Sequence, residues 1–283
     1  MIAEDSKKEV INNIKNALLA GDHNVTVETN DPVLSSEEKE KIVNKYLKER
    51  NSIKYKINNR IARIITFMAT HSDDKATKII GLENIEDIKG GAIITSNHFN
   101  PKDSVPIRKL AKIKKKGKID IVGKETNLAM TGLSGFLMNY MNIIPISHLY
   151  SYMKKAFPDM LKEKLESGAF VLIYPEQEMW LNYKKPRHLK PGAYYFAAKF
   201  NVPIISCFVE IVETNEKENS EFYKTEYVLH ILNPIYPDKN KTVKENSKDM
   251  MEKDYKQKKE AYEKAYGKEL TYEFEKDDIA GLI

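Results

Sequence analysis

The sequence contains a single cysteine, Cys207, among its 283 residues. One cysteine excludes an intramolecular disulfide and any zinc site built from several cysteines. Such low cysteine use favours a reducing, cytoplasmic compartment. The sequence also contains no complete glycine-rich phosphate loop and no metal-binding triad. We therefore expect no bound metal and no bound cofactor.

Long apolar runs are also missing. No stretch reaches the roughly 18 consecutive apolar residues that mark a membrane-spanning helix. The first 20 residues mix acids with lysines and lack the apolar block of a secretory signal. We therefore expect neither a transmembrane span nor a signal peptide, although the chain could still lie on a membrane surface.

Charge of one sign is not in large excess. The chain carries 46 lysines and arginines against 41 aspartates and glutamates, a net charge of +5. This balance argues against a protein dominated by nucleic-acid binding, so we expect no nucleic-acid partner. With 41% hydrophobic and 10% aromatic residues, the chain can bury a sizeable core, and intrinsic disorder is excluded.

Short runs rich in Ile and Val predict the strands of the central region. They occupy residues 78–85, 91–97, 118–125, 169–176, 202–211 and 226–235. Helical or turn-rich stretches separate them, and this alternation predicts an α/β fold with a mixed, largely parallel sheet flanked by helices. The last two runs are close enough in sequence to pair antiparallel. We place the α/β core at residues 76–237.

Helical segments are expected on both sides of this core. Residues 35–70 are interpreted as a helix that opens with a Ser cap followed by acids, within an N-terminal helical segment of residues 1–75. Residues 238–268 carry ten lysines and seven acids and predict a charged helix that ends at Gly267. This helix lies in a C-terminal tail of residues 238–283.

The second half of the N-terminal helix is basic and amphipathic. Apolar residues recur at helical spacing from Ile53 to Met68, four cations lie among them, and no acid occurs from Asn51 to Ser72. Such a helix suits the surface of an anionic membrane, where each cation adds about 1 kcal/mol. An ordinary helix docked on the domain, with solvated cations, is the alternative.

The first candidate site is the segment Ser96–Asp103, which directly follows an apolar run. Residues just beyond the carboxyl end of a parallel strand line the ligand crevice, which places His98 there. Asp103 can return to the imidazole across a strand-to-helix turn, hold its tautomer and leave the other ring nitrogen free as a general base. The alternative is a histidine that hydrogen-bonds within its own turn while Asp103 caps a helix.

The second candidate site follows the apolar run 170–173 and begins with Tyr-Pro-Glu, ending at Glu176. Three cations, Lys184, Lys185 and Arg187, come shortly afterwards. Two strand ends that supply polar residues predict one shared crevice. A general base after one strand and cations after the other would suit a substrate that has an acceptor hydroxyl group and carries a phosphate. A solvated loop is the alternative for the cations.

Segment Asn97–Asp103 resembles the Asn-His-x4-Asp motif of the glycerophospholipid acyltransferase family, whose best-known members are bacterial 1-acylglycerol-3-phosphate acyltransferases. Three further blocks follow in the family's order, over residues Gly135–His148, Tyr174–Glu176 and Val202–Ile205. The resemblance covers about residues 80–235. Two departures stand out, because His148 occupies the place of an arginine and the third block lacks the usual Gly-Thr-Arg.

The resemblance implies transfer of a fatty acyl group from acyl-CoA or acyl carrier protein to the free hydroxyl of 1-acylglycerol-3-phosphate. In this reaction His98 is the general base and Asp103 orients it, while Asn97 and Glu176 belong to the substrate site. The contacts expected to replace the missing arginines at the acceptor phosphate are His148, Lys184, Lys185 and Arg187. The implied location is the inner face of the cell membrane, as a cytoplasmic, peripheral protein.

An acyl chain needs an apolar slot, and residues 127–147 hold no charged side chain in 21 positions. Methionines in this segment suit an adaptable apolar surface. The side chains expected to line the slot are Phe136, Leu137, Met138 and Met141. Core packing under the sheet is the alternative. A slot should lie on the same side of the molecule as the basic helix.

Two other functions stay open. The missing arginines allow an acyltransferase of the same fold that acts on a different lysolipid or a membrane alcohol. A catalytically silent, lipid-binding member of the family is the other alternative. The intact pair of His98 and Asp103 argues against it.

Overall fold

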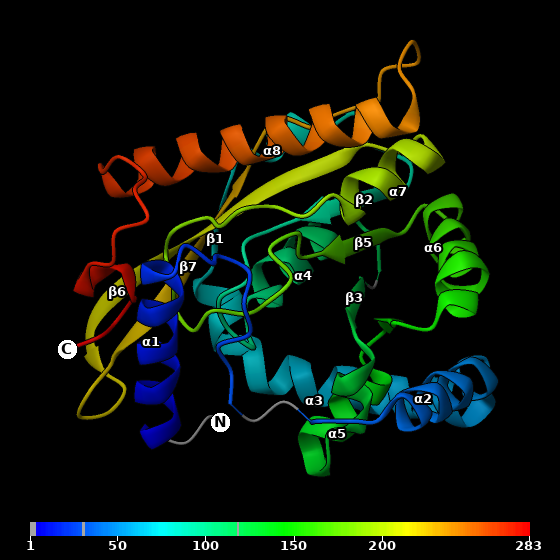
Figure 1. Cartoon of the computed structure of the whole chain (residues 1–283), viewed down its shortest axis with the longest axis horizontal. Coiled ribbons are helices and arrows are strands. Elements are labelled where there is room, and N and C mark those ends of the chain that lie inside the picture. The colour runs from blue at the N-terminus through cyan, green and yellow to red at the C-terminus, as the bar shows by residue number, and fades with distance from the viewer. Residues whose placement is uncertain (1–3, 30–31, 118) are drawn as a thin grey trace.

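The computed structural model describes residues 4–29, 32–117 and 119–283, which include a seven-stranded sheet covered by helices (Figure 1). The strands are β1 (Lys78–Ile80), β2 (Ala92–Thr95), β3 (Asp120–Lys124), β4 (Ile143–Ile146), β5 (Phe170–Ile173), β6 (Ile204–Lys217) and β7 (Tyr223–Ile231). Their order in the sheet is β1-β7-β6-β2-β5-β3-β4.

Most neighbouring strands of this sheet are parallel. β2 pairs in parallel with both β5 and β6, β3 with both β5 and β4, and β1 with β7. Only the pair β6–β7 is antiparallel among the described strands. The expected mixed, largely parallel sheet is therefore confirmed, together with the antiparallel pairing of the last two runs.

The helices are α1 (Glu4–Leu19), α2 (Ser36–Glu49), α3 (Ile53–Ala76), α4 (Ser104–Ile113), α5 (Gly132–Tyr140), α6 (Phe157–Glu166), α7 (Gly192–Phe200) and α8 (Val243–Tyr266). α8 has a capping box at Thr242 and ends at Gly267, whose φ of 64° is the left-handed conformation that glycine adopts readily. The predicted C-terminal charged helix is confirmed.

The single helix expected over residues 35–70 is wrong, because two helices fill this range. Ser35 caps α2 through a capping box with Glu38, as the sequence predicted. α2 ends at Glu49, and Ser52 begins a new helix by accepting a hydrogen bond from the Tyr55 backbone N–H. The second serine cap therefore separates α3, which carries the basic amphipathic pattern, from α2.

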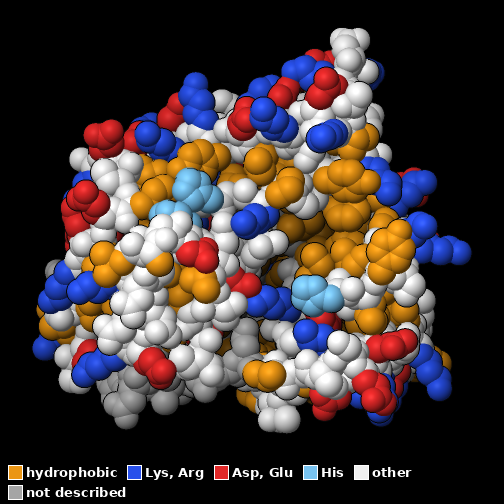
Figure 2. Space-filling view, in the orientation of Figure 1, with side chains coloured by type: hydrophobic (Ala, Val, Ile, Leu, Met, Phe, Trp, Pro, Cys, Tyr) orange, Lys and Arg blue, Asp and Glu red, His pale blue; other side chains and the backbone are white. Residues whose placement is uncertain are grey.

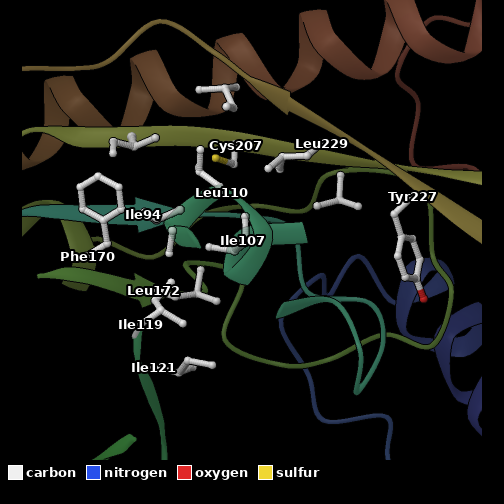
Figure 3. Close-up of a cluster of buried hydrophobic side chains, with 14 of the residues drawn as sticks. Ile94, Ile107, Leu110, Ile119, Ile121, Phe170, Leu172, Cys207, Tyr227 and Leu229 are labelled. Atoms are coloured by element: carbon white, nitrogen blue, oxygen red, sulfur yellow. The ribbon is translucent and has the colours of Figure 1, made fainter. Parts of the chain in front are cut away.

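Alternate residues of the central strands build a core on each face of the sheet. On one face, Ile94 and Leu172 pack with Ile107 and Leu110 of α4, as Figure 3 shows. On the other face, neighbouring strand residues pack against α6, α7 and α8. Cys207 is fully buried in the first cluster, and burial raises the pKa of its thiol to about 12, so the thiol stays protonated and unreactive.

Strand β4 was not predicted. Its residues fall inside the segment expected to form the acyl slot, and Pro145 interrupts the apolar run. A proline lacks a backbone N–H donor and is tolerated in a sheet chiefly on an edge strand. β4 is such an edge strand, since it pairs only with β3 in the described sheet.

α3 leaves an apolar stripe uncovered along its length. Ile53, Ile57, Ile64 and Met68 are each more than half exposed, and Ile61 is 43% exposed. Over residues 4–29, 32–117 and 119–283, no helix has the length and apolar character needed to cross a bilayer.

Candidate active site

His98 lies one turn beyond the end of β2, and Asp103 directly precedes α4. The imidazole Nδ1 is 2.6 Å from the Asp103 Oδ2 atom, so the predicted return of the carboxylate to the histidine is present. Asp103 is 3% exposed, and its Oδ2 also accepts a hydrogen bond from the Phe99 backbone N–H at 3.0 Å. The carboxylate makes no capping bond to α4. Asp103 therefore organises the turn and the imidazole rather than the helix.

Tyr174 completes the surroundings of this pair. Its hydroxyl donates to the Asp103 Oδ1 atom at 2.5 Å, and its ring stacks on the His98 ring with centroids 4.0 Å apart. Burial, then the charge of Asp103, raises the pKa of the Tyr174 phenol well above its ordinary value, so the phenol remains a donor. The sequence reasoning used this residue only to recognise a block and missed its contact with Asp103.

Glu176 holds the His98 turn against the following loop. Its Oε2 atom accepts the His98 backbone N–H at 3.2 Å, and its Oε1 atom accepts the Arg187 backbone N–H at 2.9 Å. The side chain is 1% exposed and forms an ion pair with the Arg187 guanidinium at 3.0 Å. This geometry makes Glu176 a positioning residue of the site.

Arg187 is also buried, at 1% exposure, which differs from its expected role at an acceptor phosphate. Its guanidinium packs on the Trp180 ring and donates to the carbonyl oxygens of His98, His23 and Glu178. Burial lowers the pKa of Arg187, and the nearby Glu176 carboxylate opposes this change. Because protein acceptors surround the guanidinium, we correct the expectation and treat Arg187 as a structural cation.

The two lysines of the same loop are also paired with protein carboxylates. Lys185 is 3% exposed and lies 2.8 Å from the Asp278 carboxylate. Lys184 lies 2.8 Å from the Glu213 carboxylate, and its side chain is 13% exposed. We therefore correct the expectation for Lys185 as well, while Lys184 has only a small exposed fraction to offer a ligand.

Asn97 and His148 occupy different environments. Asn97 is 1% exposed and bonds both the N–H and the carbonyl of Val209, which fastens the end of β2 to β6. This placement favours a structural role over the expected substrate contact. His148 is exposed and follows β4, the strand at the sheet edge.

Lys124, the last residue of β3, is a cation that the sequence did not indicate as part of the site. Its Nζ atom lies 2.7 Å from the carboxylate of Glu178, a residue that follows Glu176 by two positions. Because β2, β3, β4 and β5 are parallel, their carboxyl ends meet at one edge of the sheet. His98, Lys124, His148 and Tyr174 therefore share that edge.

The apolar segment expected to form the acyl slot packs beside α3. Asn59 of α3 donates to the Tyr140 carbonyl at 2.5 Å, and the Thr66 hydroxyl contacts the Met141 sulfur at 3.3 Å. The two segments thus lie on one side of the molecule, as a slot requires. Met141 is buried and lines a cavity of about 320 Å³ between α3 and α4. The other three expected lining residues, Phe136, Leu137 and Met138, are half-buried on α5.

A hollow lined by apolar side chains is visible beside α6 and α7 in Figure 2. Half-buried apolar residues pack against the core cluster on the face of the sheet that α6 and α7 cover, among them Leu149, Met153 and Phe196. The structure thus offers more than one apolar surface near the sheet, and the acyl slot remains a prediction.

Within the described part of the chain, one group of three carboxylates is close enough to hold a metal ion: Glu275, Asp277 and Asp278. Lys268 forms ion pairs with the first two, and Lys185 pairs with the third. These lysines already balance the negative charge of the group.

One protein-family model covers the segment that contains the motif. Residues 76–210 match the profile of the family described as Acyltransferase. No curated protein matches the chain significantly. Among solved structures, the chain is similar to the 1-acyl-sn-glycerophosphate (LPA) acyltransferase PlsC from Thermotoga maritima, at 17% identity and a TM-score of 0.47, over 93% of this chain and 98% of that chain. The matched residues 76–210 include the His98–Asp103 pair, so the segment that carries the candidate site is the part of the chain that resembles the acyltransferase family.

Proposed function

We propose that the protein transfers a fatty acyl group from the thioester of acyl-CoA or acyl carrier protein to the free hydroxyl of 1-acylglycerol-3-phosphate, giving phosphatidic acid. The observation that carries this proposal is the 2.6 Å contact between His98 Nδ1 and Asp103. A carboxylate at Nδ1 fixes the tautomer in which Nε2 is the proton acceptor.

In the proposed reaction, His98 Nε2 removes the proton of the acceptor hydroxyl. The hydroxyl oxygen attacks the thioester carbonyl carbon and forms the new C–O bond. The tetrahedral intermediate then expels the thiolate by breaking the C–S bond, and the imidazolium returns the proton to sulfur. Asp103 stabilises the imidazolium between these steps, and no covalent enzyme intermediate is needed. General-base catalysis of this kind contributes about 10² to 10⁴ in rate.

The acceptor phosphate needs cations near His98. We assign this role to Lys124 and His148, which share the carboxyl edge of the sheet with His98. Both Lys124 and Lys184 pair with a protein carboxylate, but the Lys184 side chain is only 13% exposed against 37% for Lys124, so Lys184 is the weaker candidate. The burial of Arg187 and Lys185 favours the alternative that the acceptor is another lysolipid or a membrane alcohol.

We further propose that the enzyme works as a peripheral protein on the cytoplasmic face of a membrane. The exposed isoleucines of α3 support this, because their apolar stripe would enter the boundary between head groups and acyl chains. The partners are then the lysophospholipid, the acyl-CoA or acyl carrier protein and the membrane surface. No nucleic-acid partner and no bound cofactor are part of the proposal.

Acyl transfer by the purified protein on liposomes tests the reaction, with one acyl-thioester donor and a panel of lysolipids. We expect transfer to 1-acylglycerol-3-phosphate, and a loss of at least about 100-fold in His98→Ala and Asp103→Asn. The exposed His71 supplies a matched control, His71→Ala, which should keep its rate. Transfer to another lysolipid but not to 1-acylglycerol-3-phosphate would show that the proposed acceptor is wrong and that the other lysolipid is the acceptor. No transfer to any acceptor, or equal rates in folded His98→Ala, would reject the reaction or the base.

A further inference from the structure

A second polar cavity, of about 560 Å³, lies at the opposite edge of the sheet from His98. Asp120 and Asn142, which stand at the amino ends of β3 and β4, form its inner wall. The outer wall comes from the junction of α2 with α3 and from the end of α6. Its charged lining residues are Arg50, Lys56, Arg60, Arg63, Lys164, Asp120 and Glu163.

The cavity has an excess of positive charge. Five cations against two acids leave a formal charge of +3 (5 − 2). Arg50 pairs with Glu163 at 3.0 Å and Lys164 with Asp120 at 3.2 Å, so both acids are already balanced. The remaining cations are Lys56, Arg60 and Arg63. They are exposed, and none forms an ion pair with a residue that the structure describes.

Neutral donors stand beside these cations. Tyr46 and Tyr55 belong to the residues that line the cavity. Burial raises the pKa of Tyr55 to about 12 and that of Tyr46 further, so both phenols stay protonated and can donate at neutral pH. Guanidinium groups with neutral donors suit a phosphate, which offers several acceptor oxygens and a negative charge.

The three remaining cations occupy one face of α3. Lys56, Arg60 and Arg63 are spaced i, i+4 and i+7, so they line up along the helix. This face borders the exposed apolar stripe that contains Ile57 and Ile64. If the stripe enters a bilayer, as the proposed function holds, the cations lie at the depth of the lipid phosphates.

We propose that this cavity binds a phosphate group, carried by an anionic phospholipid or by free phosphate, at a site separate from the catalytic one. That the phosphate belongs to a membrane lipid rests on the proposed peripheral location of the protein. That the cavity binds a phosphate group does not rest on this location, and neither statement depends on the role of His98. The site would hold α3 in a fixed orientation on its ligand.

Calorimetric titration of the full-length protein with monomeric dihexanoylphosphatidylglycerol tests the site. The neutral dihexanoylphosphatidylcholine and inorganic phosphate are the comparison ligands. The test variant is Arg60→Gln/Arg63→Gln. The matched control is Lys48→Gln/Lys54→Gln, which removes the same charge from α2 and α3 outside the cavity. All titrations are repeated in the His98→Ala background, so that loss of acyl transfer and loss of binding are read separately.

We expect the anionic lipid to bind the wild type and the His98→Ala protein equally, and the test variant at least tenfold more weakly. The control variant should stay within about twofold of wild type. If inorganic phosphate also binds the wild type and binds the test variant at least tenfold more weakly, free phosphate is a ligand of the site. Binding of the anionic lipid alone identifies the head group. Absent binding, or equal losses in both double variants, would overturn the proposal.

Discussion

At the residue scale, both oxygens of the Asp103 carboxylate are engaged by the site. Oδ2 contacts His98 and the Phe99 N–H, while Oδ1 accepts the Tyr174 hydroxyl. Tyr174 therefore shares with His98 the carboxylate that orients the imidazole, and its hydroxyl helps to fix the orientation of that carboxylate.

Replacing Tyr174 by Phe tests this contact, because it keeps the ring that stacks on His98 and removes only the hydroxyl. The Asp103 carboxylate then loses the donor that fixes its orientation toward His98, so we expect kcat/KM to fall about tenfold, which corresponds to about 1.4 kcal/mol in activation free energy. Tyr236→Phe, at a 56% exposed position, serves as control and should leave kcat/KM unchanged. An unchanged kcat/KM in folded Tyr174→Phe would show that the hydroxyl does not position the carboxylate.

Arg187 offers a second prediction at this scale. Its replacement by Met leaves the Glu176 carboxylate buried without its partner, so the free energy of unfolding should fall by about 3–5 kcal/mol in urea denaturation. Lys190→Met, at an exposed position of the same loop, should change it little. The ratio of KM values for a phosphorylated and an unphosphorylated acceptor should stay constant. A selective rise for the phosphorylated acceptor would instead restore Arg187 as a phosphate contact.

These residues show how far the sequence could predict the site. The spacing from His98 to Asp103 is local, so a single turn could be anticipated from the motif. The Tyr174 contact depends on β5 lying beside β2, and no local pattern reveals that order. The polar loop around Arg187 suggested that its side chain is exposed to solvent. The side chain is buried instead, and one of its acceptors is the carbonyl of His23, a residue distant in sequence that no local pattern could reveal.

At the scale of elements, α3 combines the exposed apolar stripe with the cationic face. Helical periodicity predicted this pattern, since spacing alone defines the faces of a helix. The break before Ser52 was missed because the apolar pattern continues across it, and only the cap marks the new start. β4 was missed because Pro145 argues against a strand until its edge position is known.

The stripe gives a prediction for membrane binding. Ile57→Asn/Ile64→Asn removes two side chains that are 55% and 53% exposed, so the fold should be unaffected. A buried isoleucine contributes about 1.5–3 kcal/mol, so partitioning onto liposomes in a flotation assay should fall at least tenfold. The control is Val33→Asn/Ile80→Asn, which alters exposed apolar residues outside α3. Equal partitioning of the two double variants would remove α3 from the membrane contact.

At the scale of the whole molecule, an N-terminal segment after α1 closes over the active-site loop. Asn24 donates to the carbonyl of Glu176 at 3.1 Å and to that of His188 at 2.9 Å. His23 contacts the ring of His188, with centroids 4.6 Å apart. The hydrogen bonds show that the N-terminal segment braces the loop from outside the α/β core.

The same segment makes stability depend on pH. Burial, then the charge of His188, lowers the pKa of His23 below its ordinary 6.5. Between the lowered pKa of His23 in the folded chain and its pKa of 6.5 in the unfolded chain, the unfolded chain binds a proton that the folded chain does not. The free energy of unfolding should therefore fall as the pH drops below 6.5, whereas above pH 6.5 the stabilisation by neutral His23 is fully present. Urea denaturation at about pH 7.5 and about pH 5.5 measures the loss.

His23→Gln should show a smaller difference between the two pH values than wild type. The exposed His148 provides a matched control, because His148→Gln should retain the full difference. If His23→Gln shows the same difference in unfolding free energy as wild type and His148→Gln, protonation of His23 does not cause the pH dependence of stability.

Asn182 joins the catalytic turn to the last residues of the chain. Its N–H donates to the Phe99 carbonyl at 2.7 Å, its side chain accepts from Asn100 at 2.9 Å, and its own carbonyl accepts the Ala280 N–H at 2.8 Å. Ala280 follows His98 by 182 positions (280 − 98). Because contacts between residues so far apart form only after the intervening chain has paid its loop-closure entropy, the turn that bears His98 should gain this support late in folding.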